Sequence, residues 1–194
     1  MKRLAAPVRL AFLCLAVTPA ALVATPALAQ RTAVSAQLSP EAAGEAFARA
    51  VTEVCVPAVS GNGVSSLAAA RDGKVSPTQD AETRQQAGAE ADETVWDVAE
   101  ARGVVTVREK AGRCVVSVYG PGAAPVILQL GAQLENGHRF ERLMSPQGPN
   151  GLGLSLMRSE GGKTVMVQLE GSQPGAQGHQ SRFSVVTAVV FVAQ

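Results

Sequence analysis

Short runs of β-branched residues recur along the second half of this sequence, and they constrain its fold more than any other feature. Residues 104–108 and 114–119 flank a short turn that contains glycine, which predicts a β-hairpin. Residues 152–158 and 163–169 flank a similar turn and predict a second hairpin. Residues 182–192 are apolar on both faces, as in a strand at the middle of a sheet. We therefore expect an antiparallel sheet of five or six strands.

Two longer segments carry the helical repeat of apolar residues. The first helix is expected over residues 40–55, with Ser39 as its N-cap and Pro40 in its first turn. Pro57 is expected to end this helix, because proline lacks the N–H that a helix interior requires. The second helix is expected over residues 125–136. Together with the sheet, these segments predict an α+β fold with both helices packed on one face.

The N-terminus has the features of a secretory signal peptide. A short cationic region precedes the apolar residues 10–24, and Ala27-Leu28-Ala29 fits the small-x-small pattern that signal peptidase recognises. The predicted mature protein begins at Gln30. The alternative, a membrane anchor, is disfavoured because the apolar stretch is short for a span and prolines interrupt it.

The expected organisation is a signal peptide over residues 1–29, a flexible leader over 30–38 and a single α+β domain over 39–194. No later segment has the roughly 18 uninterrupted apolar residues of a membrane span, so we expect a soluble periplasmic or secreted protein. Cleavage removes cationic residues and no acidic ones, which leaves the mature chain slightly acidic. This charge balance argues against a nucleic-acid partner.

Two cysteines remain in the mature chain, because Cys14 leaves with the signal peptide. In an oxidising compartment, Cys55 and Cys114 are expected to form one disulfide that ties the first helix to the first hairpin. Such a bond would close a loop of about 60 residues, worth about 4 kcal/mol. The alternatives are a buried pair of free thiols or a metal site, and two cysteines without nearby histidines make a poor zinc site.

Signatures of catalysis are missing from the sequence. There is no nucleophile elbow, no phosphate-binding loop, no dinucleotide fingerprint and no HExxH motif. His138 and His179 stand beside glycines in segments that are expected to be loops. We therefore predict no catalytic residue, no metal site and no cofactor, although carboxylates that meet only in the fold stay an open alternative.

A further strand is expected over residues 139–144. Six cationic residues gather in and beside this strand and the two strands of the first hairpin, namely Arg102, Arg108, Lys110, Arg113, Arg139 and Arg142. If these strands are neighbours, the residues form a cationic strip that could bind an anionic partner. The alternative is that they are edge-strand charges that prevent aggregation. The acidic excess lies elsewhere, in residues 80–93, which are expected to be a solvated helix face or loop.

Three short motifs resemble those of a family of small exported bacterial proteins of unknown function. They are Cys-Val-Pro at residues 55–57, Val-Trp at 95–96 and Gly-Arg-Cys at 112–114. The resemblance extends over residues 43–192 and implies a similar fold and a disulfide between the helix and the hairpin. It implies no catalytic residue.

The expected function is therefore that of a non-catalytic binding or envelope-interaction protein in the periplasm. Its partner is an unidentified component of the envelope or periplasm. The alternative is a small periplasmic enzyme that acts on envelope glycan or peptide. A concave pocket that holds a glutamate or a histidine beside the cationic residues would favour the enzyme.

Overall fold

The computed structural model describes residues 38–110, 112–120, 122–143, 152–172 and 185–193. The predicted signal peptide and its cleavage site lie outside the described residues, as do Cys14, His179 and all of the leader except Leu38. Within the described ranges, no helix is long and apolar enough to cross a membrane.

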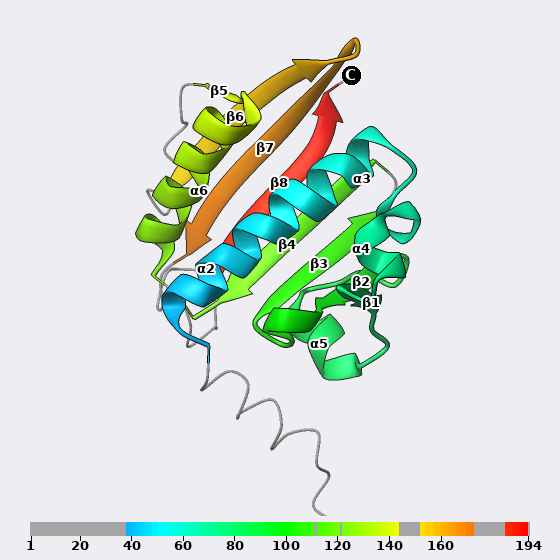
Figure 1. Ribbon diagram of the computed structural model, residues 1–194. Coiled ribbons are helices and arrows are strands. Elements are labelled where there is room, and N and C mark those ends of the chain that lie inside the picture. Colours follow the sequence, from blue (N-terminus) through cyan, green and yellow to red (C-terminus); the bar gives the residue numbers. More distant parts are fainter. Residues whose placement is uncertain (1–37, 111, 121, 144–151, 173–184, 194) are drawn as a thin grey trace, which may run out of the picture.

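Eight antiparallel strands form one sheet in the order β1-β2-β3-β4-β8-β7-β6-β5 (Figure 1). The strands are β1 (Val75–Pro77), β2 (Thr94–Val98), β3 (Val105–Lys110), β4 (Arg113–Tyr119), β5 (Glu141–Arg142), β6 (Gly153–Glu160), β7 (Lys163–Ser172) and β8 (Val185–Ala193). Both predicted hairpins are present, as β3–β4 and β6–β7. The last described strand, β8, pairs with β4 and β7, so its expected central position is confirmed.

The expected number of five or six strands is wrong, because the sheet has eight. Its two edges are its shortest strands, since β1 has three residues and β5 has two. β5 lies within the strand predicted over residues 139–144, but the three residues of β1 are too few to show the alternation that identifies a strand in a sequence. β1 forms because Val75 is buried opposite Val98 of β2, which is a contact between distant segments.

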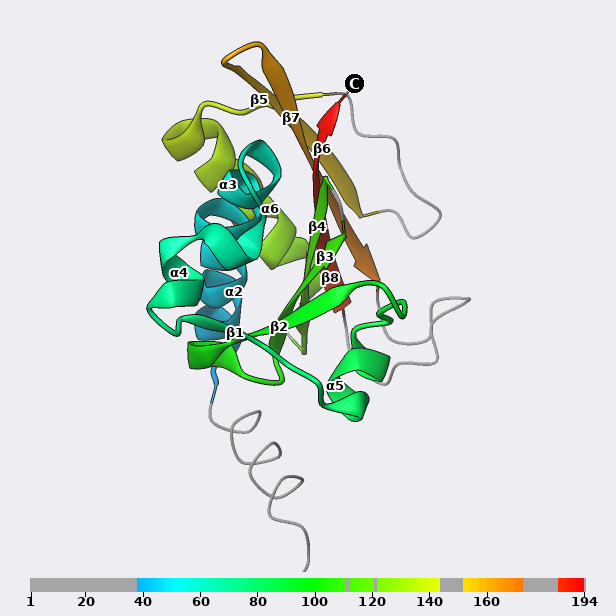
Figure 2. The same cartoon turned by 90° about the vertical axis from the view of Figure 1, so that its right-hand side faces the viewer.

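Two long helical segments cover one face of the sheet, as expected (Figure 2). The first consists of α2 (Pro40–Arg49), η1 (Ala50–Cys55) and α3 (Val56–Ser60), and the second is α6 (Ala123–His138). The side chain of Ser39 accepts a hydrogen bond from the N–H of Ala42, which confirms the predicted N-cap. Phe47, Leu130 and Leu134 are buried between the helices and the sheet, so the core lies in this layer.

Pro57 does not end the first helix, contrary to the prediction. The segment η1 is a π-helix, in which the N–H of Val56 donates to the carbonyl of Val51, and α3 continues to Ser60. In an α-helix, the proline ring would clash with the carbonyl four residues earlier. The wider π turn changes the hydrogen-bond pattern just before Pro57, and we attribute the continued helix to this change.

The predicted disulfide is present and joins Cys55 of η1 to Cys114 of β4. The two Cα atoms are 5.3 Å apart, within the usual range for a disulfide. Both cysteines are fully buried. The bond therefore fixes the end of the π turn to a strand at the middle of the sheet.

Residues 80–93 lie on the face of the sheet that the two long helical segments leave uncovered, as the position of the short helix α5 (Ala81–Gln86) shows (Figure 2). They begin with this helix, which is capped by Asp80, whose Oδ2 accepts the N–H of Thr83 at 2.7 Å. The hydroxyl of Tyr119 donates to the carbonyl of Gln86 at 2.9 Å. Short helical turns elsewhere are η2 (Val64–Ser66), α4 (Ala68–Arg71) and η3 (Ala99–Ala101). The acidic segment is thus a packed part of the fold and not only a solvated loop.

Candidate functional site

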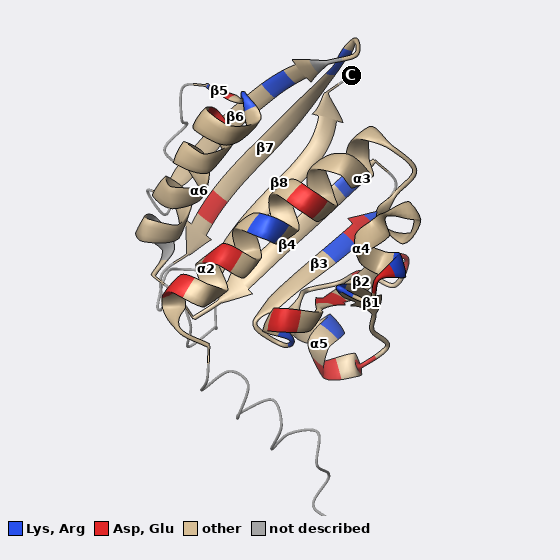
Figure 3. Ribbon diagram, viewed as in Figure 1, with Lys and Arg blue, Asp and Glu red and all other residues tan. Residues whose placement is uncertain are grey.

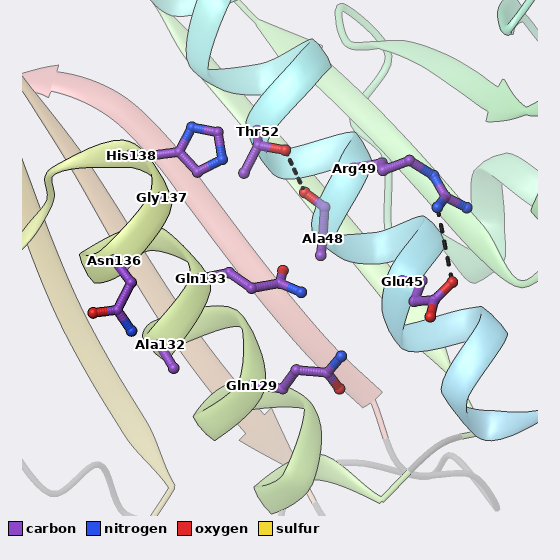
Figure 4. Close-up of a pocket in the computed structure, with 10 residues that line it drawn as sticks. All are labelled: Glu45, Ala48, Arg49, Thr52, Gln129, Ala132, Gln133, Asn136, Gly137 and His138. Carbon is purple, nitrogen blue, oxygen red and sulfur yellow. Dashed lines mark hydrogen bonds and ion pairs between the residues drawn. The ribbon is translucent and has the colours of Figure 1, made fainter.

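A groove of about 760 Å³ runs between α2 and α6 on the outer surface of the helical layer (Figure 4). We call it the interhelical groove. Its walls are formed by Glu45, Ala48, Arg49 and Thr52 on one side and by Gln129, Ala132, Gln133, Asn136, Gly137 and His138 on the other. Seven of these ten residues have polar side chains, although apolar atoms make up most of the lining surface, and the two walls come from segments far apart in the sequence.

The width of the groove follows from how the helices pack. They run side by side in the same direction (Figure 4), and Gly44 of α2 lies close to Val126 of α6. A methyl group placed on Gly44 would lie 3.7 Å from Cγ2 of Val126, an ordinary van der Waals distance. Each helix turns its apolar stripe toward the sheet, which leaves the adjoining polar stripes to face one another.

The α6 wall presents side chains that are free to bind. Gln129, Gln133 and His138 point across the groove toward α2 (Figure 4). Within the described part of the chain, none of these three side chains has a hydrogen-bond or ion-pair partner, and all three residues are exposed. Polar groups that lack a protein partner are available to a ligand at no cost in broken contacts.

The α2 wall carries opposite charges that compensate each other. Arg49 Nη1 lies 3.8 Å from Oε2 of Glu45, and Arg49 Nη2 lies 2.9 Å from Oε1 of Glu100 in η3. The hydroxyl of Thr52 donates to the carbonyl of Ala48 at 2.9 Å. The groove is therefore close to neutral and suits a ligand without a net charge.

The groove does not assemble a recognisable catalytic pair. Glu45 lies near the Gln129 end, whereas His138 faces Thr52 at the other end (Figure 4). General acid–base work on one bond needs its acid and base within hydrogen-bond reach of the same substrate atoms. Among the described residues there is also no cluster of three histidine, cysteine, aspartate or glutamate side chains that could hold a metal ion.

The six cationic residues predicted to form a strip do not lie together (Figure 3). Arg108 and Lys110 are on β3, Arg113 begins β4, and Arg102 follows η3. Arg139 and Arg142 lie beside and in β5, at the far edge of the sheet. Four strands separate β3 from β5, so the structure divides the six residues into two groups.

Acidic side chains neutralise several of these cations. Arg108 Nη1 lies 3.0 Å from Oε2 of Glu93, and both side chains are largely buried. Lys110 Nζ donates to Glu90 at 2.7 Å and lies 3.0 Å from Asp92. The hydrogen bonds to Glu90 and Asp92 raise the pKa of Lys110, and the bond from Lys110 lowers the pKa of Asp92. The acidic residues 80–93 thus neutralise two cations of β3, although the two segments are separated in the sequence.

Arg142 is also neutralised by an acidic side chain, that of Glu135 in α6. Its Nε and Nη2 atoms donate to the two carboxylate oxygens of Glu135 at 2.7 and 2.9 Å. The hydrogen bonds to Glu135 raise the pKa of Arg142. Three of the six cations, Arg102, Arg113 and Arg139, have no ion-pair partner among the residues that the structure describes. They belong to different parts of the fold.

Two smaller cavities adjoin charged side chains. One, of about 410 Å³ at the end of the β3–β4 hairpin, is lined in part by Lys110, Arg113 and Glu109. This cavity does place a glutamate beside two of the cationic residues, the arrangement expected of an enzyme, but Oε1 of Glu109 accepts the N–H of Val64 at 2.7 Å and so already holds η2 in place. The other, of about 180 Å³, lies beside η1 and includes Glu53. The interhelical groove is larger than either and is the candidate site.

Sequence reasoning missed the groove residues except for His138, which it placed in an ordinary loop. The structure makes His138 the last residue of α6 and a part of the groove wall. One available signal was the spacing of Gln129 and Gln133, which puts two amides on one face of a predicted helix. The sequence did not indicate that α2 lies opposite them.

Comparison of the chain with protein-family models, with curated proteins and with solved structures finds no match in any of the three.

Proposed function

We propose that this chain is an exported, non-catalytic binding protein that holds a polar ligand of the cell envelope or periplasm in the interhelical groove. The observation that carries the proposal is the row of unpartnered side chains at Gln129, Gln133 and His138, which faces the first helix across a groove of about 760 Å³. A concave site with a few convergent polar groups is the usual form of a binding site.

The walls of the groove are well anchored, which favours binding because little conformational entropy is lost. The disulfide ties the first helix to β4 at Cys55, three residues beyond Thr52. The second helix packs closely on β6, where Gly131 lies against the side chain of Leu154. Both walls are therefore fixed to the same sheet.

Export is part of the proposal and has two supports. Residues 1–29 have the pattern of a signal peptide, and a disulfide is typical of an oxidising compartment such as the periplasm. The resemblance to small exported bacterial proteins of unknown function belongs to the same proposal. Recovery of the protein from the periplasm with Gln30 as its first residue would support it, and an intact N-terminus there would contradict it.

The groove also supports binding over catalysis. A hydrolase of envelope glycan or peptide is the competing function, because Glu45 and His138 do line the same groove. Glu45 and His138 lie at opposite ends of the groove, so they do not form an acid–base pair (Figure 4). We therefore propose no catalytic role for them.

The test is an NMR titration of the mature, isotope-labelled protein with two envelope fractions, one of solubilised peptidoglycan and one of peptides. We expect changes in the amide signals of α2 and α6 around the groove. Ala132→Trp should abolish these changes by filling the groove, whereas Ala68→Trp should not. Both alanines are exposed on helices, and only Ala132 lines the groove.

Two results would overturn the proposal. One is the absence of signal changes at the groove with both fractions. The other is a change in the mass of either fraction that the wild-type protein causes and the Ala132→Trp variant does not, because this would show catalysis.

A further inference from the structure

We infer that the ligand of the interhelical groove is the main chain of an extended peptide. This inference rests on the proposed function, because it assumes that the groove is the binding site. Three features of the groove support it, namely the spacing of its amides, their hydrogen-bonding capacity and the composition of the rest of the lining.

The spacing of the glutamines matches the repeat of an extended chain. Gln129 and Gln133 are four residues apart on α6, which corresponds to about 6 Å along a helix axis. An extended peptide advances about 6.6 Å for every two residues. Two successive peptide groups that face α6 would therefore lie opposite the two side chains, with a mismatch below about 1 Å.

The hydrogen-bonding groups of the glutamine side chains also match those of a peptide main chain. A glutamine side chain offers both a carbonyl acceptor and an NH₂ donor, and each peptide group offers one N–H donor and one C=O acceptor. Gln129 and Gln133 could each form a pair of hydrogen bonds with one peptide group. Because they have no partner among the described residues, no hydrogen bond within the protein has to break first, and only bonds to water are exchanged.

The opposite wall supplies further groups without adding a net charge. Glu45 can accept a hydrogen bond from a main-chain N–H of the ligand, while the guanidinium of Arg49 pairs with Glu100. A peptide main chain is uncharged, so it fits a groove in which one acidic and one basic side chain compensate. From Gln129 to His138 the α6 wall is about 13 Å long, enough for about four extended residues.

The composition of the lining disfavours a glycan. A sugar ring has an apolar face, which large aromatic side chains can cover, and among the described residues the groove is lined by no tryptophan, tyrosine or phenylalanine. The small residues Ala48, Ala132 and Gly137 leave room for a main chain and its small side chains. The inference is therefore directed at peptides of uncharged, small-residue composition.

The experiment uses an array of acetylated, amidated decapeptides made from uncharged residues, and measures fluorescence-polarisation affinity for the strongest binder. Gln129→Ala and Gln133→Ala should each weaken binding about tenfold, because each removes two hydrogen bonds. Gln85→Ala is the matched control and should change binding less than twofold. Gln85 is an exposed glutamine of the helix α5 and does not line the groove. Equal thermal midpoints will show that the variants fold.

A second arm changes the peptide instead of the protein. Methylation of the main-chain nitrogens that face α6 removes donors and keeps every side chain, and it should weaken binding at least tenfold. Unchanged affinity after methylation, or after both glutamine substitutions, would overturn the inference.

A third arm uses chitin oligosaccharides as the glycan probe in the NMR titration. If the glycan shifts the groove signals and no peptide of the array binds, the groove is a binding site but the peptide inference is wrong. If neither probe shifts the groove signals, the inference fails together with the proposed function.

Discussion

Nη1 of Arg108 lies 3.0 Å from Oε2 of Glu93, and the two side chains are 17% and 7% exposed. The same Nη1 donates to the carbonyl of Gly88 at 3.0 Å, and Oε2 of Glu93 also accepts the N–H of Glu90. One arginine therefore fastens the segment after α5 to β3. Arg108 therefore has a partner within the fold, which the sequence pattern did not indicate.

Removal of Glu93 should destabilise the fold. Glu93→Ala leaves the guanidinium of Arg108 largely buried without its carboxylate, which should lower the free energy of unfolding by about 3 kcal/mol. Urea denaturation of the variant measures this change. Glu90→Ala is the control, because among the described residues its exposed carboxylate pairs only with exposed Lys110, and the unfolding midpoint of this variant should hardly move. Equal effects of the two variants would contradict the role of the buried pair.

Reduction of the disulfide should lower stability without changing the strand order. Loss of the Cys55–Cys114 bond releases a loop of about 60 residues, and we expect the free energy of unfolding to fall by about 4 kcal/mol. The measurement is urea denaturation with and without reductant. The variant with both cysteines replaced by alanine should match the reduced wild type and should not respond to reductant. A wild type that is unaffected by reduction would refute this prediction.

Tyr119 should make stability fall at alkaline pH. Burial raises the pKa of Tyr119, against smaller opposite effects of the Thr106 and Ser117 hydroxyls and the charge of Arg108. The unfolded state loses this proton at about pH 10, while the folded state still holds it. The contribution of Tyr119 to the free energy of unfolding is therefore fully present below about pH 10. It is lost as the pH rises through the pKa that Tyr119 has in the folded protein.

Because the chain has one tyrosine, its ultraviolet titration reports Tyr119 alone. The folded protein should titrate at higher pH than the protein in denaturant. Urea denaturation between neutral and alkaline pH should show a steeper loss of stability for wild type than for Tyr119→Phe. Identical titrations in folded and denatured protein would show that burial has no such effect.

Two glycines of α6 should respond in opposite ways to alanine. A methyl group on Gly131 would lie 2.5 Å from Cδ2 of buried Leu154, so Gly131→Ala should cost about 1–2 kcal/mol through overpacking. No atom of the described residues lies within 4 Å of the same position at Gly137, where alanine should stabilise the helix by up to about 1 kcal/mol. Thermal unfolding compares the two variants. Stabilisation by both would show that α6 sits farther from β6 than described.

Local patterns predicted much of this fold. The β3–β4 hairpin was visible because its valines alternate across a short turn, and Val107 does lie opposite Val116. The first helix was visible because Ser39 and Pro40 mark its start. Its extension past Pro57 was not visible, because it depends on a π turn that no residue pattern announces.

The site could be predicted less well than the fold, for a physical reason. Whether Arg108 and Arg142 are neighbours depends on the strand order, and that order is set by the pairing of β4 with β8, whose residues are far apart in the chain. The groove depends in the same way on how α2 and α6 meet at Gly44. A sequence shows which face of a helix is polar but not what lies opposite it.

The pairing of β4 with β8 also bears on how fast the protein can fold. Val116 of β4 lies opposite Ala188, which follows about seventy residues later, so the two halves of the sheet join only through a contact with a large loop-closure cost. Before β8 pairs with them, β4 and β7 each have one edge whose backbone groups lack a hydrogen-bonding partner strand. We expect folding in the millisecond-to-second range of sheet-rich proteins, with a period in which both edges are open to pairing with other chains.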